Sequence, residues 1–193
     1  MVKSVISEYT IQELISMDKK LCVLFPGIGY HCDKPLLYYT EMLAHSKGYE
    51  TIKLQYSGFT EEADAALHAL WLSGEQLSRV KFNQYSRVVF VGKSIGTIAA
   101  LTYREKRGVK ADCVLFTPLV QTFEHDAHGC TAFHGTADPW AATAEIERLC
   151  VDNGVKLFIY EGKNHSLETK DPAGDIKTVA AVIRTLTEED IFR

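Results

Sequence analysis

Ser94 stands at the centre of a short pattern that suits nucleophilic chemistry. It lies in Gly92-Lys93-Ser94-Ile95-Gly96, directly after the apolar run Val88–Val91 and before small residues typical of a helix. A serine hydroxyl attacks a carbonyl only when a base takes its proton and when a substrate can reach it. Glycines two residues before and two residues after the serine allow a sharp turn, because side chains there would collide with the neighbouring strand and helix. The pattern predicts a nucleophile at the apex of a strand-turn-helix unit.

An acid and a histidine follow the last two predicted strands. Asp138 lies in Gly135–Trp140, after the fifth strand, and His165 closes Gly162-Lys163-Asn164-His165, after the sixth. In an open parallel sheet, ligands bind beyond the carboxyl ends of the strands. A serine, an acid and a histidine on loops at this edge meet the geometric demand of a triad, in which nucleophile, base and orienting carboxylate converge from separate elements.

The elements that must position these residues alternate along the chain. Nearly continuous apolar runs predict strands at Leu21–Phe25, Thr51–Tyr56, Val88–Val91, Cys113–Phe116, Cys130–His134 and Lys156–Tyr160. Helical patterns predict helices at about Pro35–Lys47, Glu61–Phe82, Ile95–Arg107, Pro139–Asn153 and Ala173–Leu186. Strands that are apolar throughout are covered on both faces. The fold class is therefore α/β, a three-layer α/β/α sandwich with a mainly parallel sheet of about six strands.

The chain contains no internal repeat, low-complexity segment or linker, which predicts a single domain over residues 1–193. The segment Pro118–Gly129, between the fourth and fifth strands, is too short to hold an inserted lid domain. Two alternatives stay open near the start of the chain. Thr10-x-x-Glu13 is a possible cap of a short helix, and Ser4–Ile11 is a possible edge strand.

Composition excludes several classes of protein. A net charge of −4 without a basic tract argues against a nucleic-acid partner. No apolar run is long enough to span a membrane, and the first residues lack the apolar core of a signal peptide, so a cytoplasmic location is expected. The five cysteines contain no CxxC pair, which favours reduced, buried thiols. The oligomeric state is left open.

The chain resembles the α/β-hydrolase family in three segments: Gly92–Gly96, His134–Asp138 and Gly162–His165. That family uses the same order of serine, acid and histidine. The resemblance extends from Leu21 over nearly the whole chain. It implies that Ser94 is the nucleophile, that His165 is the general base and then the general acid, and that Asp138 holds the imidazole. It implies no metal and no cofactor.

The resemblance also implies an oxyanion hole made of two backbone N–H groups. One belongs to Ile95, the residue after the nucleophile. The other belongs to Ile28, in the loop after the first strand, where Pro26-Gly27 stands in place of the family's common His-Gly. Loss of one such donor typically costs about 2.7–4 kcal/mol of transition-state stabilisation.

Each candidate also has a structural interpretation. Ser94 could lie in an ordinary helix N-cap turn, and His165 could be a histidine of a surface loop. Asp138 could cap a helix that begins with Pro139, and the two roles are compatible. His134 fits a packed residue at the end of a strand better than a second base.

Other patterns carry weaker signals. Gly92-Lys93-Ser94 resembles part of a phosphate-binding P-loop, but Arg87 stands where that motif needs glycine. His125-x-x-His128 has a spacing compatible with metal binding, but a polar loop is the favoured interpretation. Tyr30, His31 and Trp140 are the tentative substrate-lining residues, and His31 could equally face solvent.

These observations favour a metal-independent serine hydrolase of the esterase or thioesterase type. It would cleave a carboxylic ester or related acyl bond of a small molecule through an acyl-enzyme, without a membrane or nucleic-acid partner. Two alternatives remain. The chain could keep the fold only to bind a ligand or partner, or it could use the same site for non-hydrolytic chemistry, such as that of a lyase or perhydrolase.

Overall fold

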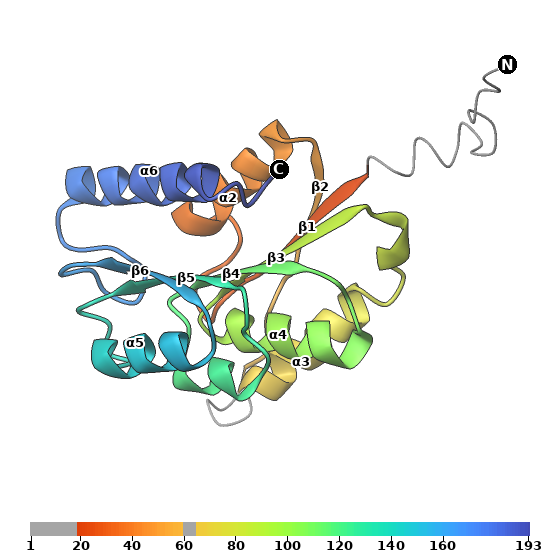
Figure 1. The fold of residues 1–193 in the computed structure, drawn as a ribbon, viewed down its shortest axis with the longest axis horizontal. Coiled ribbons are helices and arrows are strands. Elements are labelled where there is room, and N and C mark those ends of the chain that lie inside the picture. The colour runs from red at the N-terminus through yellow and green to blue at the C-terminus, as the bar shows by residue number, and fades with distance from the viewer. Residues whose placement is uncertain (1–18, 60–64) are drawn as a thin grey trace, which may run out of the picture.

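Six strands form one sheet with helices on both faces (Figure 1). The computed structural model describes residues 19–59 and 65–193. The strands are β1 (Lys20–Phe25), β2 (Tyr49–Lys53), β3 (Arg87–Lys93), β4 (Asp112–Phe116), β5 (Thr131–Gly135) and β6 (Lys156–Tyr160). The α-helices are α2 (Pro35–Ser46), α3 (Ala65–Gln76), α4 (Ile95–Arg107), α5 (Thr143–Asp152) and α6 (Pro172–Glu188), and two 3-10 helices are η2 (Phe82–Gln84) and η3 (Val120–Glu124).

The sheet has the order β2-β1-β3-β4-β5-β6, and every pair of neighbouring strands is parallel. The predicted three-layer sandwich is thereby confirmed. The chain runs outward from β1 to β2 and then continues on the other side of β1 with β3. A reversal of this kind opens a crevice at the carboxyl ends of the two strands, where parallel sheets bind their ligands. The segments that follow β1 and β3 are those that contain Ile28 and Ser94.

The core lies in two layers because successive side chains of a strand point to opposite faces. In β1, Leu21, Val23 and Phe25 belong to the apolar cluster that includes residues of α3, α4 and α5. Cys22 and Leu24 belong to the cluster that includes residues of α2 and α6. Figure 1 shows these two groups of helices on opposite faces of the sheet. The strands are therefore apolar throughout because helices cover both faces of the sheet.

Three predicted elements differ from the structure by more than two residues at one end. β2 begins at Tyr49 rather than Thr51, because its ladder with β1 pairs Tyr49 with Lys20 and ends with Lys53 opposite Leu24. The predicted helix over 61–82 ends at Gln76. The Gln76 side-chain amide there exchanges two hydrogen bonds of 2.9 Å with the backbone of Gln55, after β2.

The helix predicted from Pro139 begins only at Thr143, and its N-cap residue is Ala142. Before it, the Asp138 carboxylate accepts a hydrogen bond of 2.9 Å from the Trp140 N–H group. The Asp-Pro signal of the sequence therefore forms a local turn and not a helix start.

The two alternatives at the start of the chain, Ser4–Ile11 and Thr10-x-x-Glu13, lie outside the described residues. All five cysteines are buried and unpaired, as the sequence predicts. Within the described ranges, no helix has the length and apolar character that crossing a membrane requires.

Candidate active site

Ser94 occupies a strained turn between β3 and α4. Its backbone has φ 55° and ψ −124°, and its N–H group donates a 3.0 Å hydrogen bond to the Phe116 carbonyl. Residues other than glycine rarely adopt such a positive φ. A Cβ atom at Gly96 would lie 2.1 Å from the Phe25 carbonyl oxygen, and one at Gly92 would lie 2.7 Å from the Gly96 carbonyl oxygen. Both glycines are therefore required for the close packing of α4 against the sheet.

The turn brings the Ser94 hydroxyl to the imidazole of His165. Oγ of Ser94 lies 2.8 Å from Nε2 of His165, and Nδ1 of the same ring lies 2.7 Å from Oδ2 of Asp138. The three side chains come from the segments after β3, β5 and β6. Ser94 makes no side-chain cap to α4, and only 18% of the His165 side chain is exposed. The geometry therefore matches the chain of contacts that lets a base accept a serine proton.

Asp138 lies in surroundings that keep it ionised. Burial opposes its ionisation, but hydrogen bonds from His165 and from the Trp140 N–H group outweigh burial, so the pKa of Asp138 is lowered. A carboxylate in this state accepts a hydrogen bond from the Nδ1–H group of His165 and leaves Nε2 free to accept a proton. The arrangement thus selects the imidazole tautomer that a general base needs.

The segment after β1 passes directly over Ser94. The Gly27 N–H group donates to the Tyr30 carbonyl (3.0 Å), and the Tyr30 N–H group donates to the Gly27 carbonyl (3.2 Å), which closes a tight turn. A Cβ atom at Gly27 would lie 3.2 Å from Cβ of Ser94. Ile28 is at the tip of this turn, and Ile95 opens α4, where the first N–H groups have no partner within the helix. We name Gly27–Tyr30 the oxyanion turn, after the role that the sequence resemblance predicts for the Ile28 N–H group.

His134 lies behind Asp138 and has no exposed surface. Its Nε2 contacts the Thr143 hydroxyl at 3.2 Å, while Nδ1 lies 3.9 Å from Oδ2 of Asp138 and has no hydrogen-bond partner among the described residues. Burial lowers the pKa of His134 and so favours the neutral ring. Its place agrees with the predicted packed residue at a strand end and not with a second base.

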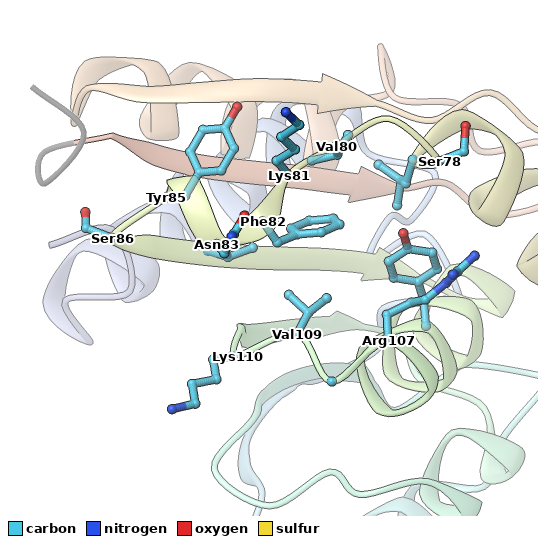
Figure 2. A pocket seen from close by; sticks show the side chains of 14 residues that line it. Ser78, Val80, Lys81, Phe82, Asn83, Tyr85, Ser86, Arg107, Val109 and Lys110 are labelled. Atoms are coloured by element: carbon cyan, nitrogen blue, oxygen red, sulfur yellow. The ribbon is translucent and has the colours of Figure 1, made fainter. Parts of the chain in front are cut away.

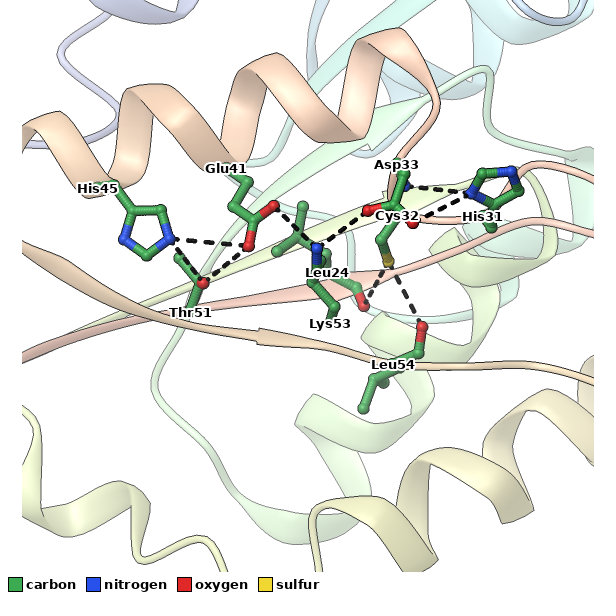
Figure 3. A network of polar contacts seen from close by, with 9 residues as sticks. All are labelled: Leu24, His31, Cys32, Asp33, Glu41, His45, Thr51, Lys53 and Leu54. Atoms are coloured by element: carbon green, nitrogen blue, oxygen red, sulfur yellow. Dashed lines mark hydrogen bonds and ion pairs between the residues drawn. The ribbon is translucent and has the colours of Figure 1, made fainter.

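The three tentative lining residues have different surroundings. Trp140 is 61% exposed, and its ring centre lies 6.3 Å from that of His165, so it borders the site. Tyr30 is buried instead, and its hydroxyl accepts a 3.1 Å hydrogen bond from the Leu36 N–H group. His31 lies beside Asp33 at one end of a polar network that links α2 and β2 (Figure 3).

His125 and His128, considered as metal ligands, have other contacts. The His125 ring lies 2.9 Å from the Thr102 hydroxyl and 2.9 Å from the Glu105 carboxylate. The His128 N–H group donates to the Asp126 carboxylate. In the described ranges, no group of three or more histidine, cysteine or acidic side chains could hold a metal ion.

Two cavities differ in their position relative to Ser94. A cavity of about 590 Å³ is lined by Phe82, Arg107 and Val109, among others, at the amino ends of β3 and β4, the edge opposite Ser94 (Figure 2). A second cavity, of about 450 Å³, starts at Ile95, the residue after Ser94. Neither cavity is lined by Ser94, Asp138 or His165, and of the two only the second is lined by a residue adjacent to Ser94, namely Ile95.

The sequence patterns did not indicate a function for Lys93. Lys93, considered only within a P-loop pattern, is 1% exposed and next to Ser94. The available signal was a lysine inside an otherwise apolar strand, because lysine is almost never fully buried without a partner.

This protein is similar to known proteins in structure and not in sequence. No protein-family model matches the sequence, and no curated protein matches it. An α/β serine hydrolase homologue from Coxiella burnetii matches with a TM-score of 0.65 at 13% identity, over 87% of this chain and 85% of that one. Est1E from Butyrivibrio proteoclasticus matches with a TM-score of 0.66 at 11% identity, over 89% and 88%. A lidless α/β serine hydrolase from Xanthomonas campestris matches with a TM-score of 0.61 at 10% identity, over 88% and 81%.

Proposed function

Since the chain has the α/β-hydrolase fold, we propose that it is a metal-independent serine hydrolase that cleaves a carboxylic ester or a related acyl bond. The observation that carries the proposal is the unbroken contact chain from Ser94 through His165 to Asp138, at 2.8 and 2.7 Å. Binding alone needs no such chain, and a hydroxyl held against a neutral imidazole is the arrangement that activates serine.

The proposed reaction has two halves. Oγ of Ser94 attacks the acyl carbon while Nε2 of His165 takes the hydroxyl proton, and the carbonyl oxygen becomes an oxyanion. The N–H groups of Ile28 and Ile95 stabilise that oxyanion by hydrogen bonds. His165 then gives its proton to the leaving alcohol or thiol, and the acyl group stays on Ser94. In the second half, His165 takes a proton from the water that attacks the acyl-enzyme, and it returns a proton to Oγ of Ser94 as the acid leaves.

Active-site labelling tests this proposal. The protein is incubated with a fluorophosphonate probe at neutral pH, and the labelled peptide is identified by mass spectrometry. We expect one label, on Ser94, and none in Ser94→Ala. Absence of label in the folded wild type would favour a binding protein, and a label that persists unchanged in Ser94→Ala would move the nucleophile elsewhere.

The cavity at Ile95 supports a preference for small apolar acyl groups. Ile95, Ile98, Thr102 and Lys106 line it from one face of α4, opposite Leu119 and other apolar residues. Ile95 and Ile98 line the end near Ser94, whereas Thr102 and Lys106 lie two to three helical turns beyond Ile95, about 10 to 16 Å along the axis. p-Nitrophenyl esters of increasing acyl length test this preference. Est1E has been solved with ferulic acid bound, so an aromatic acyl ester belongs in the same panel.

The acid side of the pH profile is a further prediction. Burial lowers the pKa of His165, the hydrogen bond to Asp138 opposes the shift, and the charge of Lys93 adds to it. Only the neutral imidazole accepts the Ser94 proton, so activity is lost as pH falls through this pKa. We expect kcat/KM for a neutral ester to rise with pH through a pKa below about 6.5. A rise centred above pH 7 would contradict this assignment.

A further inference from the structure

Lys93 is the most buried charged side chain beside the proposed active site. It is the last residue of β3, directly before Ser94, and 1% of it is exposed. Val89 and Val91 of the same strand belong to the apolar cluster on the α2 and α6 face, and alternation along a strand points Lys93 to that face as well. Its side chain therefore lies beneath the crevice, on the side of the oxyanion turn.

The contacts of Lys93 are with the oxyanion turn. Nζ of Lys93 lies 5.0 Å from the centre of the Tyr30 ring, within the range of a cation–π interaction. A Cβ atom at Gly27 would lie 3.2 Å from the Lys93 carbonyl oxygen and 3.5 Å from its Cγ. Residues 27 and 30 are the two ends of the turn that carries Ile28. Lys93 thus lies against both ends of the turn.

Among the described residues, no carboxylate oxygen lies within 4 Å of the Lys93 ammonium. Its charged and titratable surroundings are Tyr30 after β1, Asp138 after β5, and His165 and Glu168 after β6. Burial lowers the pKa of Lys93 to about 7, and the charges of Asp138 and Glu168 oppose the shift. Burying an ammonium without a close carboxylate is unfavourable, and an apolar residue of similar size is commonly as stable or more stable. Stability therefore does not explain the lysine.

We propose that Lys93 is a positioning residue for the oxyanion hole: its ammonium, held against the Tyr30 ring, supports the oxyanion turn from below and places positive charge behind the oxyanion. This inference rests on the proposed serine hydrolase function. In a site from which water is largely excluded, charge placed in advance stabilises the charge that develops in the transition state. The ammonium also disfavours protonation of His165, which keeps the base in its active form.

Lys93→Met tests the proposal because methionine keeps the length of the side chain and removes its charge. We expect kcat for a p-nitrophenyl ester to fall about 10- to 100-fold with a KM change of less than about threefold. We also expect the melting temperature to stay equal or rise, because the buried charge is gone. The acid limb of the kcat/KM profile should move to higher pH, since a positive charge near His165 has been removed. Lys93→Arg, which keeps the charge, should retain more activity.

Lys20→Met is the matched control. Nζ of Lys20 also lies over a tyrosine ring, at 5.5 Å from the centre of Tyr49, but Lys20 is at the amino end of β1, far from Ser94. We expect unchanged kinetics and an unchanged pH profile in this variant. A test without any variant is also available. In the wild type, loss of the Lys93 proton should lower kcat/KM on the alkaline side, between about pH 7 and 9 and well below the ordinary lysine pKa.

The outcomes separate this inference from the proposed function. If the wild type is not labelled at Ser94, the serine hydrolase function fails. If the wild type is labelled and Lys93→Met keeps both kcat and the acid limb, only the role of Lys93 is overturned. The same holds if Lys93→Met loses activity only in proportion to a loss of folded protein, or if the wild type has no alkaline limb below pH 9.

Discussion

Ser94→Ala should lower kcat for a p-nitrophenyl ester by about 10⁵- to 10⁶-fold, the largest effect expected of any single substitution in this protein. The hydroxyl is the atom that forms the acyl-enzyme, and alanine has no atom to replace it. Folding should be retained, because the side chain makes no cap to α4 and, within residues 19–59 and 65–193, forms its one hydrogen bond with His165. Stopped-flow measurement of the p-nitrophenol burst checks the result, since the burst reports acyl-enzyme formation.

The double variant Ser94→Ala/His165→Ala gives the sharper test. Serine and histidine act as one unit, at 2.8 Å, so His165→Ala alone should cost nearly as much, and the double variant should be little worse than either. His128→Ala is the matched control, because it removes an exposed histidine outside the site. Losses that simply add up in the double variant would show that Ser94 and His165 act independently, against the proposal.

Asp138→Asn is expected to lower kcat by about 10⁴-fold while leaving the fold intact. The Asp138 carboxylate lies 2.7 Å from Nδ1 of His165, and because its pKa is lowered it stays ionised and can only accept a hydrogen bond there. An asparagine amide can donate to Nδ1 instead, which favours the tautomer that carries its proton on Nε2. That tautomer cannot accept the Ser94 proton.

Two controls accompany the measurement on Asp138→Asn. Asp152→Asn removes an exposed carboxylate of α5 that pairs with Arg148, and it should leave kcat unchanged. The melting temperature of Asp138→Asn separates lost chemistry from lost structure, because the Trp140 N–H group can still donate to the asparagine carbonyl. A loss of less than tenfold in a stable Asp138→Asn protein would remove Asp138 from the proposed mechanism.

Much of the fold follows from patterns that are local in the sequence. Continuous apolar runs such as Val88–Val91 predict strands covered on both faces, and the observed parallel sheet confirms the fold that they indicate. Predicted and observed boundaries differ where local signals compete with tertiary contacts. The ladder with β1 extends β2 back to Tyr49, and the Asp138 side chain turns the segment before α5 into a bend.

The sequence by itself determined which residues could meet. The spacing of Gly92, Ser94 and Gly96 prescribes the turn, and the order of strands places the segments of Asp138 and His165 at the same edge of a parallel sheet. These are properties of backbone geometry and strand direction, so they can be predicted without knowledge of side-chain packing.

Only the tertiary structure decided how the neighbouring side chains are used. Sequence patterns placed Tyr30 among residues open to substrate and gave no function to Lys93, yet packing buries both and sets the ammonium against the ring. Packing likewise leaves His134 at 3.9 Å from Asp138 and brings His165 to 2.7 Å. The burial of these side chains and the distances between them depend on contacts with segments that are remote in the sequence. The environment that tunes a charge therefore exists only once the chain is folded.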